Sequence, residues 1–103
     1  MMAKQFYVLN DKRQRIPATE EDWKAFPKNK RLVAKTELRS ADVSVWTEFH
    51  GVDYGEGEGP QLFATFSFVG NEAGQDGNYT TWAEAEAGHR AVVADYQRRF
   101  PQS

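Results

Sequence analysis

The chain has 103 residues, of which 40% are hydrophobic and 14% aromatic, with no cysteine and a formal net charge of −2. This length supports one modest core, so we expect residues 1–103 to form a single domain. Without cysteine, a disulfide, a thiolate metal site and a cysteine nucleophile are all excluded. No apolar run reaches 18 residues and the first residues form no signal-like segment, so we expect a cytoplasmic protein without membrane contact.

The charge is divided unevenly along the chain. Residues 1–40 carry ten Lys or Arg and five Asp or Glu, whereas residues 41–103 carry three and ten. A basic block can indicate a nucleic-acid surface. Here the basic residues are interleaved with acidic ones and lack the aromatic spacing of base-stacking surfaces. We therefore expect the two halves to pack together and no nucleic acid to bind.

The first 27 residues predict a hairpin and a short helix. Residues 6–9 and 14–17 are β-prone and flank a turn-like segment at 10–13. Thr19 followed by three acidic residues is typical of a helix N-terminus. Pro27 stops this helix, which we expect over residues 19–26.

Three segments then alternate between two faces and predict strands at 31–39, 43–49 and 61–69. Their short connections favour antiparallel pairing. The first places four residues together on one face: Leu32, Ala34, Thr36 and Leu38. The second has two opposed sets: Val43, Val45, Thr47 and Phe49 against Ser44, Trp46, Glu48 and His50. Residues 51–60 and 70–78 are rich in glycine and predict two loops.

The last part of the chain predicts a long helix. Thr81 and Glu84 fit a capping box, and Pro101 ends the helix. Apolar and aromatic residues recur at three- and four-residue spacing: Trp82, Ala85, His89, Val92, Val93, Tyr96 and Phe100. Gly88 within the helix permits close approach to the sheet. The predicted fold class is α+β, with an antiparallel sheet of three to five strands packed on one face by this helix.

Three blocks of the chain share a pattern with known proteins. Residues 47–54 read Thr-x-Phe-x-Gly-x-Asp, residues 57–68 contain Gly-x-Gly-Pro and Leu-Phe-x-Thr, and residues 79–89 contain Glu-Ala-x-x-Gly-His. In this order and with these gaps, they resemble a family of small accessory proteins encoded by tailed bacteriophages and prophages. The resemblance covers under half the chain. It implies a phage or prophage origin and brings no catalytic residues with it.

The chain also departs from that family pattern. Tyr54 stands where the pattern has His, Gln61 where it has a second Pro, and Ala64 where it has Glu. A metal or acid–base site built from that His and Glu would lack two members here, which argues against an enzyme. No pair of histidines lies at metal-ligand spacing, so we expect neither a metal nor a cofactor.

Two neighbouring segments form the predicted binding site. The acidic, glycine-rich loop contributes Asp53, Tyr54, Glu56 and Glu58, and one face of the preceding strand contributes Trp46, Glu48 and His50. The loop matches neither a calcium-binding loop nor a phosphate cradle, but loops on a rigid sheet commonly carry recognition. Trp46 is either an exposed interface anchor or a ring buried under the N-terminal hairpin and short helix, and the sequence leaves both open.

His89 has two interpretations. Its place in the apolar stripe of the helix predicts a ring packed against the sheet and hydrogen-bonded to a strand or loop. Alternatively, its two nitrogens and near-neutral pKa would let it act with Asp53 as a ligand or general base. We favour the packing role.

These observations favour binding over catalysis. The expected function is that of a phage or prophage accessory protein in the bacterial host cytoplasm. It would bind a host or defence-system protein, as an anti-CRISPR-like or other inhibitor. One alternative is a protein that sequesters a nucleotide messenger in a pocket lined by rings and by His89 or an arginine. The other is a small hydrolase that uses Asp53 and His89. A homodimer is left open.

Overall fold

The computed structural model describes residues 4–55 and 59–100, which form two antiparallel sheets, a long C-terminal helix and a short helix. The α+β class predicted from the sequence is confirmed. The elements in chain order are β1 (Gln5–Leu9), β2 (Arg15–Ala18), α1 (Glu20–Ala25), η1 (Lys28–Lys30), β3 (Leu32–Leu38), η2 (Arg39–Ala41), β4 (Val43–Phe49), β5 (Val52–Asp53), β6 (Phe63–Val69), β7 (Glu72–Tyr79) and α2 (Trp82–Arg99).

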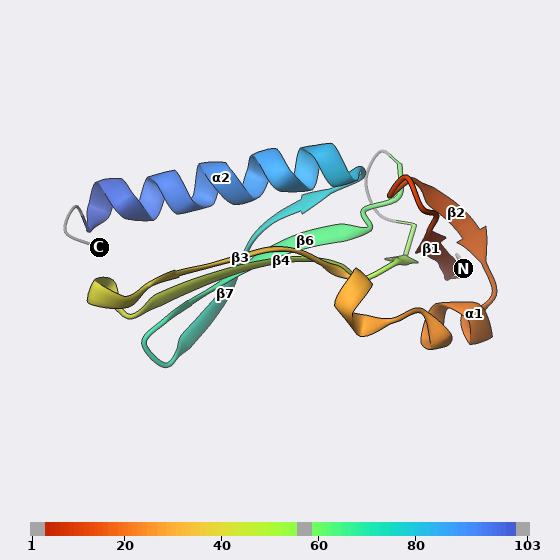
Figure 1. Cartoon of the computed structure of the whole chain (residues 1–103), viewed down its shortest axis with the longest axis horizontal. Coiled ribbons are helices and arrows are strands. Elements are labelled where there is room, and N and C mark those ends of the chain that lie inside the picture. The colour runs from red at the N-terminus through yellow and green to blue at the C-terminus, as the bar shows by residue number, and fades with distance from the viewer. Residues whose placement is uncertain (1–3, 56–58, 101–103) are drawn as a thin grey trace.

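The larger sheet has the strand order β3-β4-β6-β7, and α2 lies along one of its faces (Figure 1). Every neighbouring pair is antiparallel, as the short connections predict. The face under α2 carries Val43, Val45, Thr47 and Phe49 of β4, all of which are buried. Alternation along β4 therefore assigns its two faces correctly.

The register of β3 differs from the expected alternation at its first residue. Leu32 pairs with Glu48 and Ala34 pairs with Thr47, so Val33 is an extra residue between them. This bulge moves Leu32 to the face opposite α2, where 41% of it is exposed, while Thr36 and Leu38 stay under the helix. The prediction that Leu32 shares a face with Ala34 is wrong because a bulge shifts the period of two by one residue.

The predicted second loop at 70–78 is mostly a strand. β7 pairs with β6 from Val69↔Glu72 to Phe63↔Tyr79, with a register shift beside Phe66. The strand has almost no apolar residues, and Gly74 and Gly77 stand on its helix-facing side. A Cβ at Gly77 would lie only 2.6 Å from the Tyr79 hydroxyl, so glycine there makes room for that ring.

Side chains from α2, from both sheets and from the segment before β6 form two buried clusters. One contains Leu9, Phe49, Leu62, Phe63 and Ala85, and the other contains Leu38, Val43, Val45 and Tyr96. Aromatic rings dominate the first, where Phe49 and Phe63 lie 5.1 Å apart between centroids. The predicted apolar stripe of α2 thus supplies Ala85 and Tyr96 to the core at opposite ends of the helix.

Both ends of α2 are held by polar contacts. At the start, Thr81 Oγ1 accepts from the Glu84 amide at 3.1 Å, while the Glu84 carboxylate accepts from the Thr80 amide and hydroxyl. These bonds hold the pKa of Glu84 below its usual value. The main partner of the carboxylate is thus Thr80, one residue before the Thr81 amide that a standard capping box would use.

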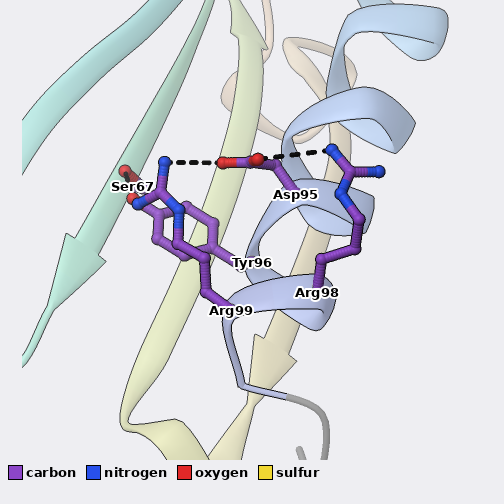
Figure 2. Close-up of polar contacts among 5 residues, drawn as sticks. All are labelled: Ser67, Asp95, Tyr96, Arg98 and Arg99. Carbon is purple, nitrogen blue, oxygen red and sulfur yellow. Dashed lines mark hydrogen bonds and ion pairs between the residues drawn. The ribbon is translucent and has the colours of Figure 1, made fainter.

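At the other end, Tyr96 reaches the sheet while its neighbours pair on the surface (Figure 2). The Tyr96 hydroxyl lies 2.8 Å from Ser67 Oγ of β6 in a buried contact. Asp95 pairs with Arg98 at 3.3 Å and with Arg99 at 2.6 Å. Cations in the last turn also suit the negative end of the helix dipole.

The smaller sheet has the order β2-β1-β5 and lies with α1 at one end of the larger sheet (Figure 1). The predicted hairpin and short helix are confirmed, with Thr19 Oγ1 accepting from the Asp22 amide as the N-cap. Trp23 of α1 ties this region to the end of β4 because its Nε1 donates to the His50 carbonyl at 2.6 Å. No helix in the described ranges is long and apolar enough to cross a membrane.

Candidate binding surface

The face of the larger sheet opposite α2 carries a set of aromatic side chains. Cross-strand partners share a face, so the pairs Trp46↔Phe66 and Ser44↔Phe68 place three rings on this side. The same row continues to Lys35 on β3 and to Gln75 on β7. We call this side of the sheet the open face, because no helix or strand of residues 4–55 and 59–100 lies over it (Figure 1).

The rings of the open face are accessible to different degrees. Phe68 is 42% exposed, whereas Trp46 and Phe66 are half-buried by their neighbours. Lys35 Nζ lies 4.3 Å from the Trp46 ring centroid, a cation–π contact, and also pairs with Glu37. Of the two alternatives for Trp46, the structure favours the accessible ring, because the N-terminal hairpin lies at the end of the sheet and not over this face.

A groove of about 480 Å³ lies at the end of the open face nearest α1. Three of the predicted binding residues line it: His50, Asp53 and Tyr54. Its floor and far wall come from the sheet, with Ala64 and Phe66 on β6 and Gln75 and Asn78 on β7. The structure therefore brings His50 of the predicted strand face together with Asp53 and Tyr54 of the predicted loop, whereas Trp46 and Glu48 do not line this groove.

Gly51 makes the sharp change of direction that carries the chain from β4 to β5. Its φ is +75°, and a Cβ would lie 2.7 Å from the Tyr7 carbonyl oxygen and 2.9 Å from the Trp23 ring. Only glycine fits such a conformation without strain. His50 and Asp53, on the two sides of this turn in the chain, both line the groove.

His50 is a neutral hydrogen-bonding group in this groove. Burial and the nearby Arg31 guanidinium both lower the pKa of His50 below its ordinary value. Its Nδ1 accepts from the Val52 amide at 3.3 Å, which leaves the proton on Nε2. Arg31 donates to the carbonyls of His50 and Trp23, which holds its guanidinium beside His50.

Asp53 and Tyr54 give the groove a carboxylate and a ring. Asp53 Oδ1 accepts from the Gly55 amide at 2.9 Å, and Tyr54 is 57% exposed beneath Lys4, whose Nζ lies 5.5 Å from the ring centroid. Within the described residues no hydrogen bond joins Asp53 to His50, so the pair is not arranged as a nucleophile-activating couple. The groove combines apolar area with separate polar groups.

The structure does not bring Asp53 and His89 together. His89 lies on the sheet-facing side of α2 and is only 5% exposed. Its Nδ1 lies 2.8 Å from Thr47 Oγ1 and its Nε2 lies 2.9 Å from Thr36 Oγ1. Burial lowers the pKa of His89, and both of its nitrogens are occupied. The packing role is therefore confirmed for His89, whereas Asp53 lines a groove on the other face of the sheet.

The remaining predicted site residues divide into two groups. Glu48 is exposed on the open face beside Trp46. Glu56 and Glu58 lie outside the described residues. Sequence reasoning missed Phe66, Phe68 and Gln75, which complete the surface. Alternation in 61–69 assigns Phe66 and Phe68 to one face, but only the pairing with β4 shows that this is the face of Trp46.

No metal centre is evident in the described part of the chain, since no three His, Asp or Glu side chains there are close enough to share an ion. Comparison of the chain with protein-family models, with curated protein sequences and with solved structures finds no match.

Proposed function

We propose that the chain is a binding protein that recognises another protein through the open face and the adjoining groove. The observation that carries this proposal is the row of accessible rings, Trp46, Phe66 and Phe68, on a sheet face that nothing in the described residues covers. Aromatic residues, Trp and Tyr above all, are enriched at the energetic centres of protein interfaces. Small-molecule sites are usually concave, and four strands side by side present a broader surface than such a ligand needs.

The surroundings of the rings also suit a protein partner. Lys35, Glu37 and Glu48 border the aromatic centre, which gives an apolar middle and a charged rim. The groove adds directional contacts, because the His50 Nε2–H and the Asp53 carboxylate offer a donor and an acceptor 3 residues apart in the chain. A partner segment crossing the sheet would meet both.

The resemblance to phage and prophage accessory proteins supplies the biological setting of the proposal. Under it, the partner is a host or defence-system protein in a bacterial cell, and the chain inhibits that partner by occupying one of its surfaces. This assignment rests on family-level analogy and not on a feature of the surface itself. The surface supplies only the mode of action.

Affinity capture with matched charge variants tests the proposal. Phe68→Glu places a carboxylate on the open face, and Ala91→Glu places one on the exposed side of α2 as the control. Purified wild type should retain a bacterial partner that also binds in a reconstituted assay with both proteins pure. Phe68→Glu should weaken that binding at least about tenfold and Ala91→Glu should not, since loss of a hot spot costs about 1–2 kcal/mol or more.

Three results would contradict the proposal. Equal loss in both variants would mean that added charge, and not the open face, weakens binding. Equal retention in both would place the interface elsewhere. If wild type retains only itself, and sedimentation shows that Phe68→Glu converts a dimer to a monomer, the open face is a homodimer interface instead.

A further inference from the structure

A second groove, of about 650 Å³, lies between the β1–β2 turn and the start of α2. These two segments are neighbours in Figure 1, although about 70 residues separate them in the chain. It lies apart from the open face and shares no lining residue with the groove of His50 and Asp53. Its volume is in the range of ordinary small-molecule sites. A ligand in this groove would bind independently of the protein partner proposed for the open face.

Three cations line this groove: Lys12, Arg13 and Arg15. Within the described residues none of the three forms an ion pair with a carboxylate. Arg15 Nη1 donates to the Thr80 carbonyl at 3.1 Å, which fixes its guanidinium against the start of α2. Each guanidinium has five N–H donors, so most remain available to a ligand.

The acidic residues nearby do not cancel this charge. Glu84 is held by the Thr80 amide and hydroxyl and does not line the groove. Asp11 lines the neighbouring hollow on the far side of Arg13. The cationic stretch is thus short, with three side chains, and neither of these carboxylates lines the groove. Such an arrangement favours a compact anion over a long polyanion.

The backbone conformation at Arg13 is unfavourable for a residue that carries a side chain. Its φ is +62°, in the left-handed region. The turn is organised by Asn10, whose Oδ1 accepts from the amides of Lys12 and Gln14 at 2.9 and 3.0 Å. Glycine is the usual residue at such a position, and a residue with a side chain costs about 1–2 kcal/mol there. The Arg13 side chain makes a cation–π contact, with its guanidinium carbon 4.4 Å from the Trp82 ring centroid.

Trp82 supplies an apolar wall and an unused donor. Its indole lines the groove with Ile16 and Phe63. Its Nε1–H is buried and has no acceptor among the described residues, and an unsatisfied buried donor costs about 1–3 kcal/mol. The Arg13 guanidinium lies over this ring, so a flat ligand group would meet the stacked guanidinium and indole together.

We propose that this groove binds a small phosphate-bearing ligand of the nucleotide class. The phosphate oxygens contact Lys12, Arg13 and Arg15, since the guanidinium fork matches phosphate geometry. The planar base packs against Trp82 and Ile16. The hydroxyl and amide groups of Thr81 and Gln14 are in position for the sugar.

Calorimetric titration with ATP, AMP and inorganic phosphate tests this assignment on the whole chain. ATP should bind, AMP more weakly, and phosphate alone at least about tenfold more weakly than ATP, because phosphate lacks the base that packs on Trp82. In proton–nitrogen NMR spectra, the indole N–H signal of Trp82, assigned with Trp82→Phe, should shift on addition of ATP. The indole signals of Trp23 and Trp46 should not.

The Arg13→Gly variant distinguishes an effect on ligand binding from an effect on the stability of the fold. Glycine relieves the left-handed backbone, so the variant should be as stable as wild type or more stable while ATP binding falls at least about tenfold. Arg15→Gln should weaken ATP similarly, and Arg90→Gln, which removes an exposed cation of α2, should leave the affinity unchanged.

Other outcomes would overturn the assignment. Equal affinity for phosphate and ATP would make the groove a plain anion site without base recognition. Tighter binding of a single-stranded oligonucleotide than of ATP would make it a nucleic-acid surface. Equal loss with Arg90→Gln would mean that net charge governs the binding. Absence of heat and of an indole shift with ATP at millimolar concentration would mean that the groove does not bind nucleotides.

Discussion

The imidazole Nδ1 of His89 on α2 lies 2.8 Å from the hydroxyl of Thr47 on β4. The same hydroxyl lies 2.6 Å from Thr65 Oγ1 on β6, and the other ring nitrogen of His89 reaches Thr36 on β3. One helix residue thus joins three strands through a buried polar network. Such a network fixes how the helix sits on the sheet, because any displacement would leave buried polar atoms unpaired.

Replacement of Thr47 by Val should destabilise the protein by about 1–3 kcal/mol. Valine keeps the shape of the side chain but removes the hydroxyl between His89 and Thr65, leaving both without this partner in a buried site. Urea unfolding followed by circular dichroism measures the effect. Thr47→Ser is the matched variant: it keeps the hydroxyl, so it should retain more of the stability than Thr47→Val. The role assigned to the network would be wrong if Ser proved the more damaging replacement.

The stability of the fold should fall as the pH is lowered from about 7.5 to 5.5. Burial lowers the pKa of both His89 and His50 in the folded chain, with Arg31 adding to the effect at His50. Through this window the unfolded chain takes up protons near pH 6.5 that the folded chain does not, so acid favours unfolding. Each histidine contributes a slope of at most about 1.4 kcal/mol per pH unit.

The variants His89→Gln and His50→Gln should each reduce the slope of the unfolding free energy against pH by the contribution of the histidine that is removed. This holds whatever the stability of the variant at pH 7.5. The free energy of unfolding is measured by urea titration at several pH values above 5.5, where most carboxylates stay ionised. An unchanged slope in both variants would contradict the assignment of these two histidines as the acid-sensitive groups.

Gly88→Ala should destabilise the protein although alanine is the better helix former. A Cβ at Gly88 would collide with the ring of Tyr79 on β7, and overpacking of this kind costs about 1–3 kcal/mol, more than the roughly 1 kcal/mol of helix propensity gained. Gly74→Ala is the control, because a Cβ there meets nothing within 4 Å. Thermal unfolding should show a lower midpoint for Gly88→Ala and an equal or higher one for Gly74→Ala. The reverse order would contradict the packing between α2 and β7.

The elements that the sequence predicts well are those with a clear local period. β4 alternates throughout, and α2 combines the cap at Thr81 with an apolar stripe, so both appear where they are expected. β7 has no such signal. It is a strand because β6 offers it a paired edge, and Gly77 makes room for the Tyr79 ring, which no local pattern encodes.

The candidate surfaces also contain residues that local sequence groups together and residues that only long-range contacts bring together. His50, Asp53 and Tyr54 are close in the chain, and the sequence groups them before their geometry is known. Phe66 joins Trp46 only through the register of β4 and β6, and Arg13 meets Trp82 across almost 70 residues. Long-range contacts of this kind depend on the path of the whole chain, so composition and spacing cannot reveal them.

The end of α2 offers a comparison between a buried neutral bond and an exposed ion-pair group. Tyr96→Phe removes the hydroxyl that lies 2.8 Å from Ser67 Oγ in the core, and should cost about 1–2 kcal/mol. Asp95→Asn removes the partner of Arg98 and Arg99 on the surface (Figure 2), and should cost less than about 1 kcal/mol. Added salt should shrink the second effect and leave the first unchanged, because screening acts on exposed charges. Urea unfolding of both variants at low and high salt measures the four values. A larger cost for Asp95→Asn than for Tyr96→Phe would mean that the ion pairs, and not the Tyr96–Ser67 contact, anchor the helix end to the sheet.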